Sequence, residues 1–191
     1  MTMARLFERR DLESPGWYRF VFESTALVPL WTLARLYLGW QWLQSGWGKL
    51  DGDGWINNDG VALRSFWERI VVVPEEGRPA ISYDWYRDFI QYMLDHEWYT
   101  WFAWVIAFGE VIVGLALIIG AFTAVAAFFG ATMNFSFLLA GSASTNPVML
   151  IIAIFLVLGW KVAGLIGVDR WLLPALGTPW QAGRAFELLK R

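Results

Sequence analysis

The sequence predicts an all-α membrane protein in which four transmembrane helices form a bundle. Of its 191 residues, 57% are hydrophobic, a fraction typical of proteins that cross the membrane several times. From Trp98 to Ala140 the chain carries one charged residue, Glu110, and this apolar segment is long enough for two spans of about 20 residues each. We treat residues 1–191 as a single membrane domain.

Four apolar segments match the length of a membrane-spanning helix. The first has Pro29 in its opening turn, where a missing N–H costs little, and a turn at Gly120 divides the second from the third. Asn146-Pro147 is a typical start for the fourth. The expected spans cover residues 26–48, 98–119, 121–140 and 147–167.

The connection between the first two spans, residues 51–97, is too long to be an unstructured loop in a compact fold. Turn-forming sequences interrupt it. Between them, the aromatic-rich segments 61–73 and 83–94 each predict a short helix that lies flat on the membrane or over the mouth of the bundle. We therefore expect a folded lid between the first two spans.

Basic residues next to the spans predict the orientation in the cytoplasmic membrane. Four lie in the N-terminal segment and four in the C-terminal tail, whereas the two tight turns have none; the eight are Arg5, Arg9, Arg10, Arg19, Arg170, Arg184, Lys190 and Arg191. An even number of spans puts both termini on one side. By the positive-inside rule that side is the cytoplasm, and the lid lies outside.

The composition excludes several classes of function. The chain has no cysteine, so it cannot form disulfides, hold an iron–sulfur cluster through thiolates or attach a c-type haem covalently. Its single histidine, His96, rules out an internal bis-histidine haem. A net charge of −2 gives no basic surface for nucleic acid. We expect no haem, iron–sulfur or metal centre in this chain, and no nucleic-acid partner.

Arg35 lies well inside the first span, where a guanidinium is unfavourable unless it faces protein or water. It shares a helical stripe with Gly39 and Gly46, while Glu110 lies on a stripe of small residues in the second span. At 1.5 Å per residue, counting from the cytoplasmic ends puts Arg35 and Glu110 at depths of roughly 13 and 15 Å. We therefore predict that they form an ion pair.

Further polar residues gather at nearby levels of the expected bundle. Asn134 of the third span should lie above the ion pair, level with Gln41 of the first. Two interpretations stay open for Arg35, Glu110, Asn134 and Gln41. They hold the helices together, or they line a polar pocket that opens toward the lid. The tryptophans serve mostly as an interfacial belt and in packing, and Trp42, on the Arg35 stripe, is the one to test as a cofactor contact.

Two titratable residues near the ends of spans are further candidates for ligand contacts, together with Trp42. Lys161, near the cytoplasmic end of the fourth span, either extends to the membrane surface or serves the site. His96, just outside the second span, is either a surface residue or a group that titrates near neutral pH.

Five segments carry a resemblance to a known family. They are RLYLGWQWLQSGWGKL (35–50), AFGEVIVGLALIIG (107–120), MNFSFLLAG (133–141), STNP (144–147) and GVDRWLLP (167–174). Through them the chain resembles the DoxX/DoxD family from about Leu27 to Pro174. The resemblance implies a four-helix membrane protein. Its DoxD branch implies thiosulfate:quinone oxidoreductase, in which thiosulfate is oxidised to tetrathionate and quinone takes the electrons. Many relatives have a basic residue where Ala124 follows Phe122-Thr123 here.

The residues and the resemblance together suggest a redox subunit that passes electrons from a small sulfur anion, such as thiosulfate, to membrane quinone. Arg35 would bind an anionic or carbonyl oxygen, and Glu110 would orient it or carry protons. Asn134 and Gln41 would donate hydrogen bonds. The alternative is a non-catalytic subunit that docks on a larger respiratory or photosynthetic complex, and both hypotheses imply other protein subunits. A transporter is disfavoured because the sequence has no inverted repeat.

Overall fold

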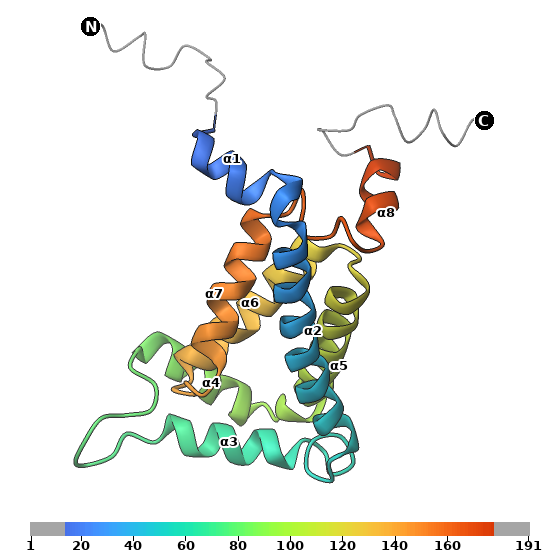
Figure 1. Ribbon diagram of the computed structural model, residues 1–191. Helices are drawn as coiled ribbons and strands as arrows, with labels where there is room; N and C mark the ends of the chain where they lie inside the picture. Colours follow the sequence, from blue (N-terminus) through green and yellow to red (C-terminus); the bar gives the residue numbers. More distant parts are fainter. Residues whose placement is uncertain (1–13, 178–191) are drawn as a thin grey trace, which may run out of the picture.

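The computed structural model describes residues 14–177 and is all-helical, as predicted, with no strand among these residues. Four helices lie side by side as a bundle, and short helices sit at its two ends (Figure 1). The bundle helices are α2 (Val28–Asp51), α5 (Tyr99–Ile119), α6 (Thr123–Leu139) and α7 (Asn146–Leu158). The short ones are α1 (Gly16–Phe22), the 3-10 helix η2 (Thr25–Leu27), α3 (Val61–Val71), α4 (Asp84–Asp95) and α8 (Asp169–Ala175).

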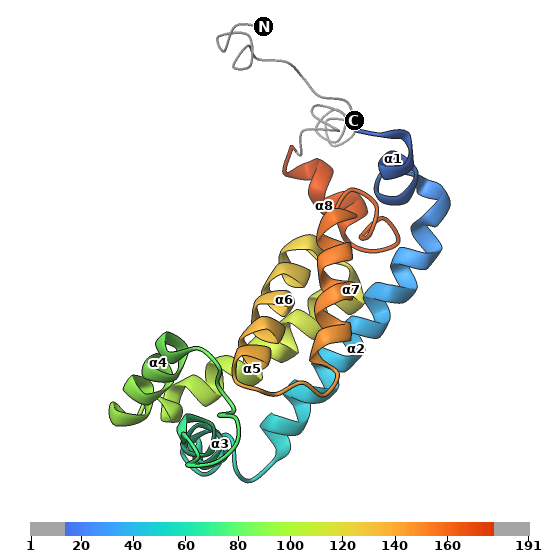
Figure 2. The same ribbon diagram turned by 90° about the vertical axis from the view of Figure 1, so that its left-hand side faces the viewer.

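The short helices divide between the two ends of the bundle. Helices α1 and α8 lie at one end, and α3 and α4 lie at the opposite end (Figures 1 and 2). The first and last described helices are therefore on the same side. Most of the basic residues that predict the orientation lie outside the described residues, namely Arg5, Arg9, Arg10, Arg184, Lys190 and Arg191.

Local signals account for several helix boundaries. Pro29 occupies the first turn of α2, and Pro147 that of α7, where proline is tolerated. Helix α5 ends at Gly120, whose φ of +69° is the left-handed conformation that glycine adopts without strain. Helix α7 stops at Leu158, while the expected fourth span continues to residue 167; turns and bends follow from Gly159 onward.

The closest helix pair in the bundle is α2 with α5, which run antiparallel and meet at glycines. A Cβ added at Gly114 of α5 would lie 2.5 Å from the Leu43 backbone nitrogen of α2. One added at Gly46 would lie 2.8 Å from the Val111 nitrogen, and one at Gly39 would lie 3.0 Å from the Gly114 carbonyl oxygen. The two backbones touch directly, which is how small residues let membrane helices associate.

The buried apolar residues form two separate cores. The larger core fills the bundle and includes Leu38, Trp42, Leu117, Ala127, Ala153 and Leu156. The smaller core lies under α3 and α4 and includes Leu63, Trp67, Ile70, Ile81, Ile90 and Met93. The segment 51–97 is therefore folded around an apolar core that it shares with Tyr99 and Ala103 of α5 and with Ala140 after α6, at one end of the bundle.

A hydrogen bond ties this segment to the bundle. Tyr86 of α4 is buried and donates its hydroxyl to the carbonyl oxygen of Ser136 on α6, at 3.0 Å. Burial raises the pKa of the Tyr86 phenol, although the hydrogen bond to Ser136 lowers it in part. The phenol is therefore a neutral donor over the physiological pH range.

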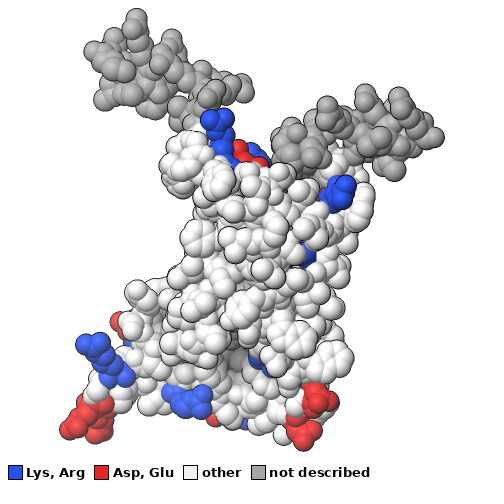
Figure 3. Space-filling model, in the orientation of Figure 1, with Lys and Arg blue, Asp and Glu red and all other residues white. Residues whose placement is uncertain are grey.

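The lateral surface of the bundle suits a lipid environment. On the face that Figure 3 shows, charged side chains gather at the two ends, and the surface between them is almost entirely uncharged. Among the described residues, α5 alone is both long and apolar enough to qualify as a membrane span, with 21 residues and a mean hydropathy of 2.4 over an 18-residue window. Helices α6 and α7 are apolar but shorter.

The glycine contact between α2 and α5 makes a prediction about stability. We expect Gly114→Ala to lower the free energy of unfolding by about 1–3 kcal/mol. The added methyl group would meet backbone atoms of α2, and the clash can be relieved only by moving the helices apart. Thermal unfolding of the detergent-purified protein measures this change.

Gly109→Ala on the same helix is the matched control. Its added Cβ would have only the Met133 sulfur nearby, at 3.8 Å. Since alanine favours helix more than glycine by up to about 1 kcal/mol, we expect Gly109→Ala to be neutral or stabilising. Equal melting temperatures for the two variants would contradict the direct backbone contact.

Candidate functional site

A cavity of about 550 Å³ lies between the two apolar cores. Its walls come from α2, α3, α4, α5, α6 and the start of α7, so they join the bundle to the segment 51–97. Most of the lining is apolar, and its aromatic members include Trp42, Trp55, Phe66, Trp67, Phe102 and Phe137. A cavity of this volume with apolar walls and few polar groups is typical of sites for small organic molecules.

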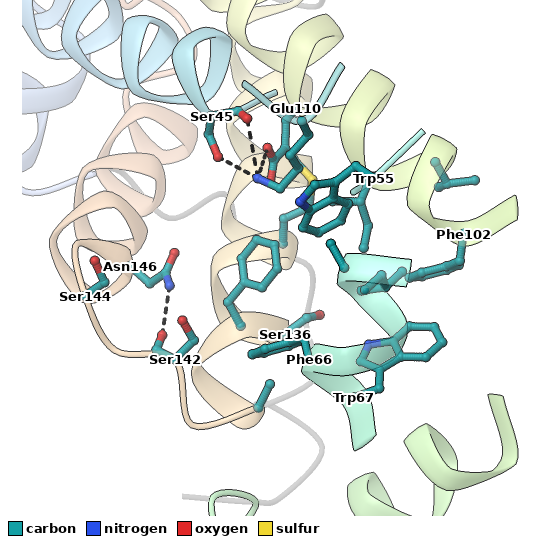
Figure 4. A pocket seen from close by; sticks show the side chains of 18 of the residues that line it. Ser45, Trp55, Phe66, Trp67, Phe102, Glu110, Ser136, Ser142, Ser144 and Asn146 are labelled. Atoms are coloured by element: carbon teal, nitrogen blue, oxygen red, sulfur yellow. Dashed lines mark hydrogen bonds and ion pairs between the residues drawn. The ribbon is translucent and has the colours of Figure 1, made fainter. Parts of the chain in front are cut away.

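Most of the polar groups of the cavity lie in two places. One is the connection between α6 and α7, where Ser142, Ser144, Thr145 and Asn146 line the cavity. Asn146 donates its side-chain N–H to the Ser142 carbonyl oxygen at 2.8 Å (Figure 4). The other is an ion pair between α2 and α5, which lies beside Trp55 in the same view.

That ion pair joins Lys49 to Glu110. The Lys49 ammonium lies 2.7 Å from Glu110 Oε2 and donates a second hydrogen bond to Ser45 Oγ at 2.8 Å (Figure 4). It also lies 5.1 Å from the centre of a Trp55 ring, a cation–π distance. The Glu110 side chain is 0% exposed and that of Lys49 is 16% exposed. Glu110 Oε1 has no hydrogen-bond partner within the described part of the chain.

The predicted ion pair between Arg35 and Glu110 is wrong. Arg35 is buried, but its guanidinium donates to backbone carbonyl oxygens, from Nη1 to Leu117 and Ile118 and from Nη2 to Ile166 at 2.6 Å. These carbonyls belong to the end of α5 and to the chain before α8, whereas Glu110 lies near the middle of α5.

The error is one of helix register. The depth count assumed that the first span begins level with the end of the second. Helix α2 instead extends past the end of α5 by about seven residues, from Val28 to Arg35. Arg35 therefore lies beside Gly120, where an added Cβ would be 2.6 Å from Arg35 Nη1. Glu110 is level with Gly46 and Lys49, about 21 Å further along α2 at 1.5 Å per residue.

Asp169 completes the structure around Arg35. Its buried carboxylate accepts the backbone N–H groups of Phe122 at 2.6 Å and Thr123 at 2.8 Å, at the start of α6. Helix starts leave such N–H groups unpaired, and a carboxylate there is favourable. Arg35 and Asp169 therefore hold the α5–α6 turn, which lies at the end of the bundle away from the cavity.

Gln41 and Trp42 of α2 both line the cavity. Asn134 does not, although it is fully buried one helical turn from Gly130, where an added Cβ would lie 2.8 Å from Trp42 Nε1. Within residues 14–177, neither Trp42 Nε1 nor the Asn134 amide has a hydrogen-bond partner. The structure thus brings Gln41, Trp42 and Glu110 to the cavity, with Asn134 in the layer behind it.

His96 and Lys161 lie away from the cavity. His96 follows α4, is exposed, stacks on Tyr92 with ring centres 4.0 Å apart, and places Nδ1 2.8 Å from the Tyr92 carbonyl oxygen. Lys161 forms an ion pair with Glu23 at 2.7 Å, at the end of the bundle that carries α1. Neither side chain contributes to the cavity lining.

Sequence reasoning missed Lys49, although a signal was present. The stripe Arg35, Gly39, Trp42, Gly46 continues in steps of four, three, four and three to Lys49. A cation at the far end of that stripe was an alternative partner for Glu110. Ser45 was missed as well, because its role depends on the hydrogen bond that it accepts from Lys49.

Comparison with known proteins gives the family. The family model DoxX matches residues 30–157, more than half of the chain, and this range includes most of α2 and all of α3 to α6. No curated protein and no solved structure matches the chain. With its all-helical fold and the extent of this match, the chain belongs to the DoxX family of membrane proteins.

Proposed function

We propose that this DoxX protein is a DoxD-like membrane subunit of a redox system and that it binds membrane quinone in the cavity next to Lys49 and Glu110. A small sulfur anion such as thiosulfate would supply the electrons. The observation that supports the proposal is an ion pair that lines an aromatic cavity of about 550 Å³ and joins Glu110, fully buried in the middle of α5, to Lys49 in the last turn of α2. Ionisable residues at such depth are expensive and are functional candidates for that reason.

The lining groups have the chemistry that a quinone needs. Its ring is flat and apolar, which suits walls such as Trp55 and Phe102, and each carbonyl oxygen accepts a hydrogen bond. The Lys49 ammonium can donate one, Gln41 can donate another, and the unpaired Oε1 of Glu110 can accept or return a proton. In this assignment Lys49 takes the role predicted for Arg35, and Asn134 lies outside the cavity lining.

The proposed reaction balances as follows. Two thiosulfate ions lose one electron each and join through a new S–S bond to give tetrathionate. One quinone takes up the two electrons and two protons and becomes quinol. The chain has no cysteine and one histidine, so electrons would pass directly from the donor or from a cofactor on another subunit. The contribution of this chain would be binding and proton transfer.

The proposal includes a topology. We place α2, α5, α6 and α7 across the cytoplasmic membrane as four spans, with the segment 51–97 as a lid outside and both termini in the cytoplasm. The uncharged lateral surface of the bundle supports this placement, as does the position of α1 and α8 at one end. Helix α2, with 24 residues, is long enough at about 36 Å. The shorter α7 would reach the surface through the turns after Gly159.

The ion pair provides a binding test. We expect Lys49→Met to weaken the binding of decyl-ubiquinone by about 10- to 100-fold, the effect of losing one charge-assisted hydrogen bond. Quenching of the fluorescence of cavity tryptophans such as Trp42 and Trp55 can follow the titration. Lys161→Met is the matched control, because it removes a lysine that is also ion-paired but lies at the other end of the bundle. The affinity of the Lys161→Met variant for decyl-ubiquinone should equal that of the wild type.

Removing Lys49 alone leaves a buried carboxylate without its partner, which can destabilise a protein by about 3–5 kcal/mol. The double variant Lys49→Met, Glu110→Gln removes both charges and avoids that penalty. If the folded double variant binds the quinone with wild-type affinity, the site is assigned wrongly.

The activity has its own test. In liposomes that contain decyl-ubiquinone, we expect the purified protein to form quinol on addition of thiosulfate, with two thiosulfate ions consumed per quinol, because that ratio balances the electrons. Glu110→Gln should lower the rate, since proton transfer would be lost. An inactive chain that co-purifies in equal amounts with a cofactor-bearing subunit would instead favour the docking function.

A further inference from the structure

We propose that helix α4 lies in the interface of the lipid bilayer, with an exposed aromatic face in contact with lipid. This face consists of Trp85, Phe89 and Tyr92, which recur at steps of four and three and therefore lie on one side of the helix. Trp85 is 62% exposed and Tyr92 49% exposed, so the described part of the chain leaves about half or more of each side chain uncovered.

Helix α4 has three distinct faces, which is the pattern expected at a boundary between protein, lipid and water. Its buried face, with Tyr86, Ile90 and Met93, packs into the smaller core. The aromatic face lies about 100° round the helix from it. The third face is exposed and carries Asp84, Asp88, Gln91 and Asp95. A helix that bordered only protein and water would need two faces.

The neighbouring helix α3 illustrates the two-faced case. It buries Leu63, Trp67 and Ile70, and its exposed side carries Arg64, Ser65, Glu68 and Arg69. Arg64 and Glu68 form an exposed ion pair at 2.7 Å. The two helices pack together under the same end of the bundle, yet only α4 exposes a row of large aromatic side chains.

The aromatic face continues onto the membrane-span candidate α5. Tyr92 contacts Trp98 with ring centres 5.6 Å apart, and Trp98 contacts Trp101 at the same distance. Trp101 is exposed in the first turn of α5. Tryptophan and tyrosine concentrate where helices enter the headgroup layer, so this continuous row places α4 at that layer. Lipid is therefore the occupant that the face fits, rather than a second protein.

Lipid contact at α4 has a consequence for the cavity. Phe89 is 46% exposed on the aromatic face and also lines the cavity. The bilayer would then reach the edge of the cavity at Phe89, and an apolar molecule could pass from the membrane to the cavity without crossing water.

Because the chain has no cysteine, single introduced cysteines can carry a spin label without further changes. We would label Trp85→Cys and Tyr92→Cys on the aromatic face, with Asp88→Cys on the acidic face of α4 and Glu68→Cys on α3 as controls. The full chain is placed in phosphatidylcholine liposomes, and collisions with oxygen and with nickel-EDDA are measured by EPR. We expect the ratio of oxygen to nickel accessibility to be several-fold higher at both aromatic positions than at both controls.

Three outcomes would overturn the proposal. Nickel accessibility at Trp85 and Tyr92 equal to that at Asp88 would mean a water-exposed face. Shielding from both reagents, or spin–spin coupling between labelled chains, would mean that protein or a second copy covers it. The third is a high ratio of oxygen to nickel accessibility that appears only when phosphatidylglycerol is added. The aromatic face carries no lysine or arginine, so the ratio should be the same with and without this anionic lipid.

Discussion

The direct backbone contact between α2 and α5 is the constraint on which the rest of the structure depends. Gly39, Gly46 and Gly114 let the two helices meet without side chains between them, and this fixes how far one is shifted along the other. The shift decides which polar side chains share a level. It places Arg35 beside the end of α5 and Glu110 beside Lys49, so the charges that the sequence alone would pair are held apart.

The buried charges consequently serve two different purposes. Arg35 supplies donors to carbonyl oxygens around the end of α5, and Asp169 accepts N–H groups at the start of α6. Backbone groups at helix ends need such partners where water is scarce. Arg35 and Asp169 thus provide hydrogen-bond partners for backbone groups on both sides of the tight turn between α5 and α6. Lys49 and Glu110 lie at the opposite level, where Glu110 keeps one oxygen without a protein partner in the described residues.

Local properties of the sequence were enough to predict the helical fold and the turn at Gly120, since apolar composition and a glycine turn are read over a few residues. The partners of Arg35 and Glu110 could not be predicted in this way. They depend on the register between two helices and on Ile166, which is far away in sequence. The capping of Thr123 by Asp169 is equally non-local. Lys49 was accessible to prediction, because it continues the stripe that contains Arg35.

The cavity owes its position to the presence of two cores instead of one. The larger core belongs to the bundle, whereas the smaller core joins the segment 51–97 to the ends of α5 and α6 through Tyr99, Ala103 and Ala140. Between the two cores lie the cavity walls and links such as the Tyr86–Ser136 hydrogen bond. Both members of the Lys49–Glu110 pair come from the bundle helices α2 and α5, while Trp55 of the segment lies 5.1 Å from the Lys49 ammonium. A molecule bound there touches both cores, and a ligand at 100 times its Kd stabilises its protein by about 2.7 kcal/mol. Binding in this cavity would therefore strengthen the attachment of the segment to the bundle.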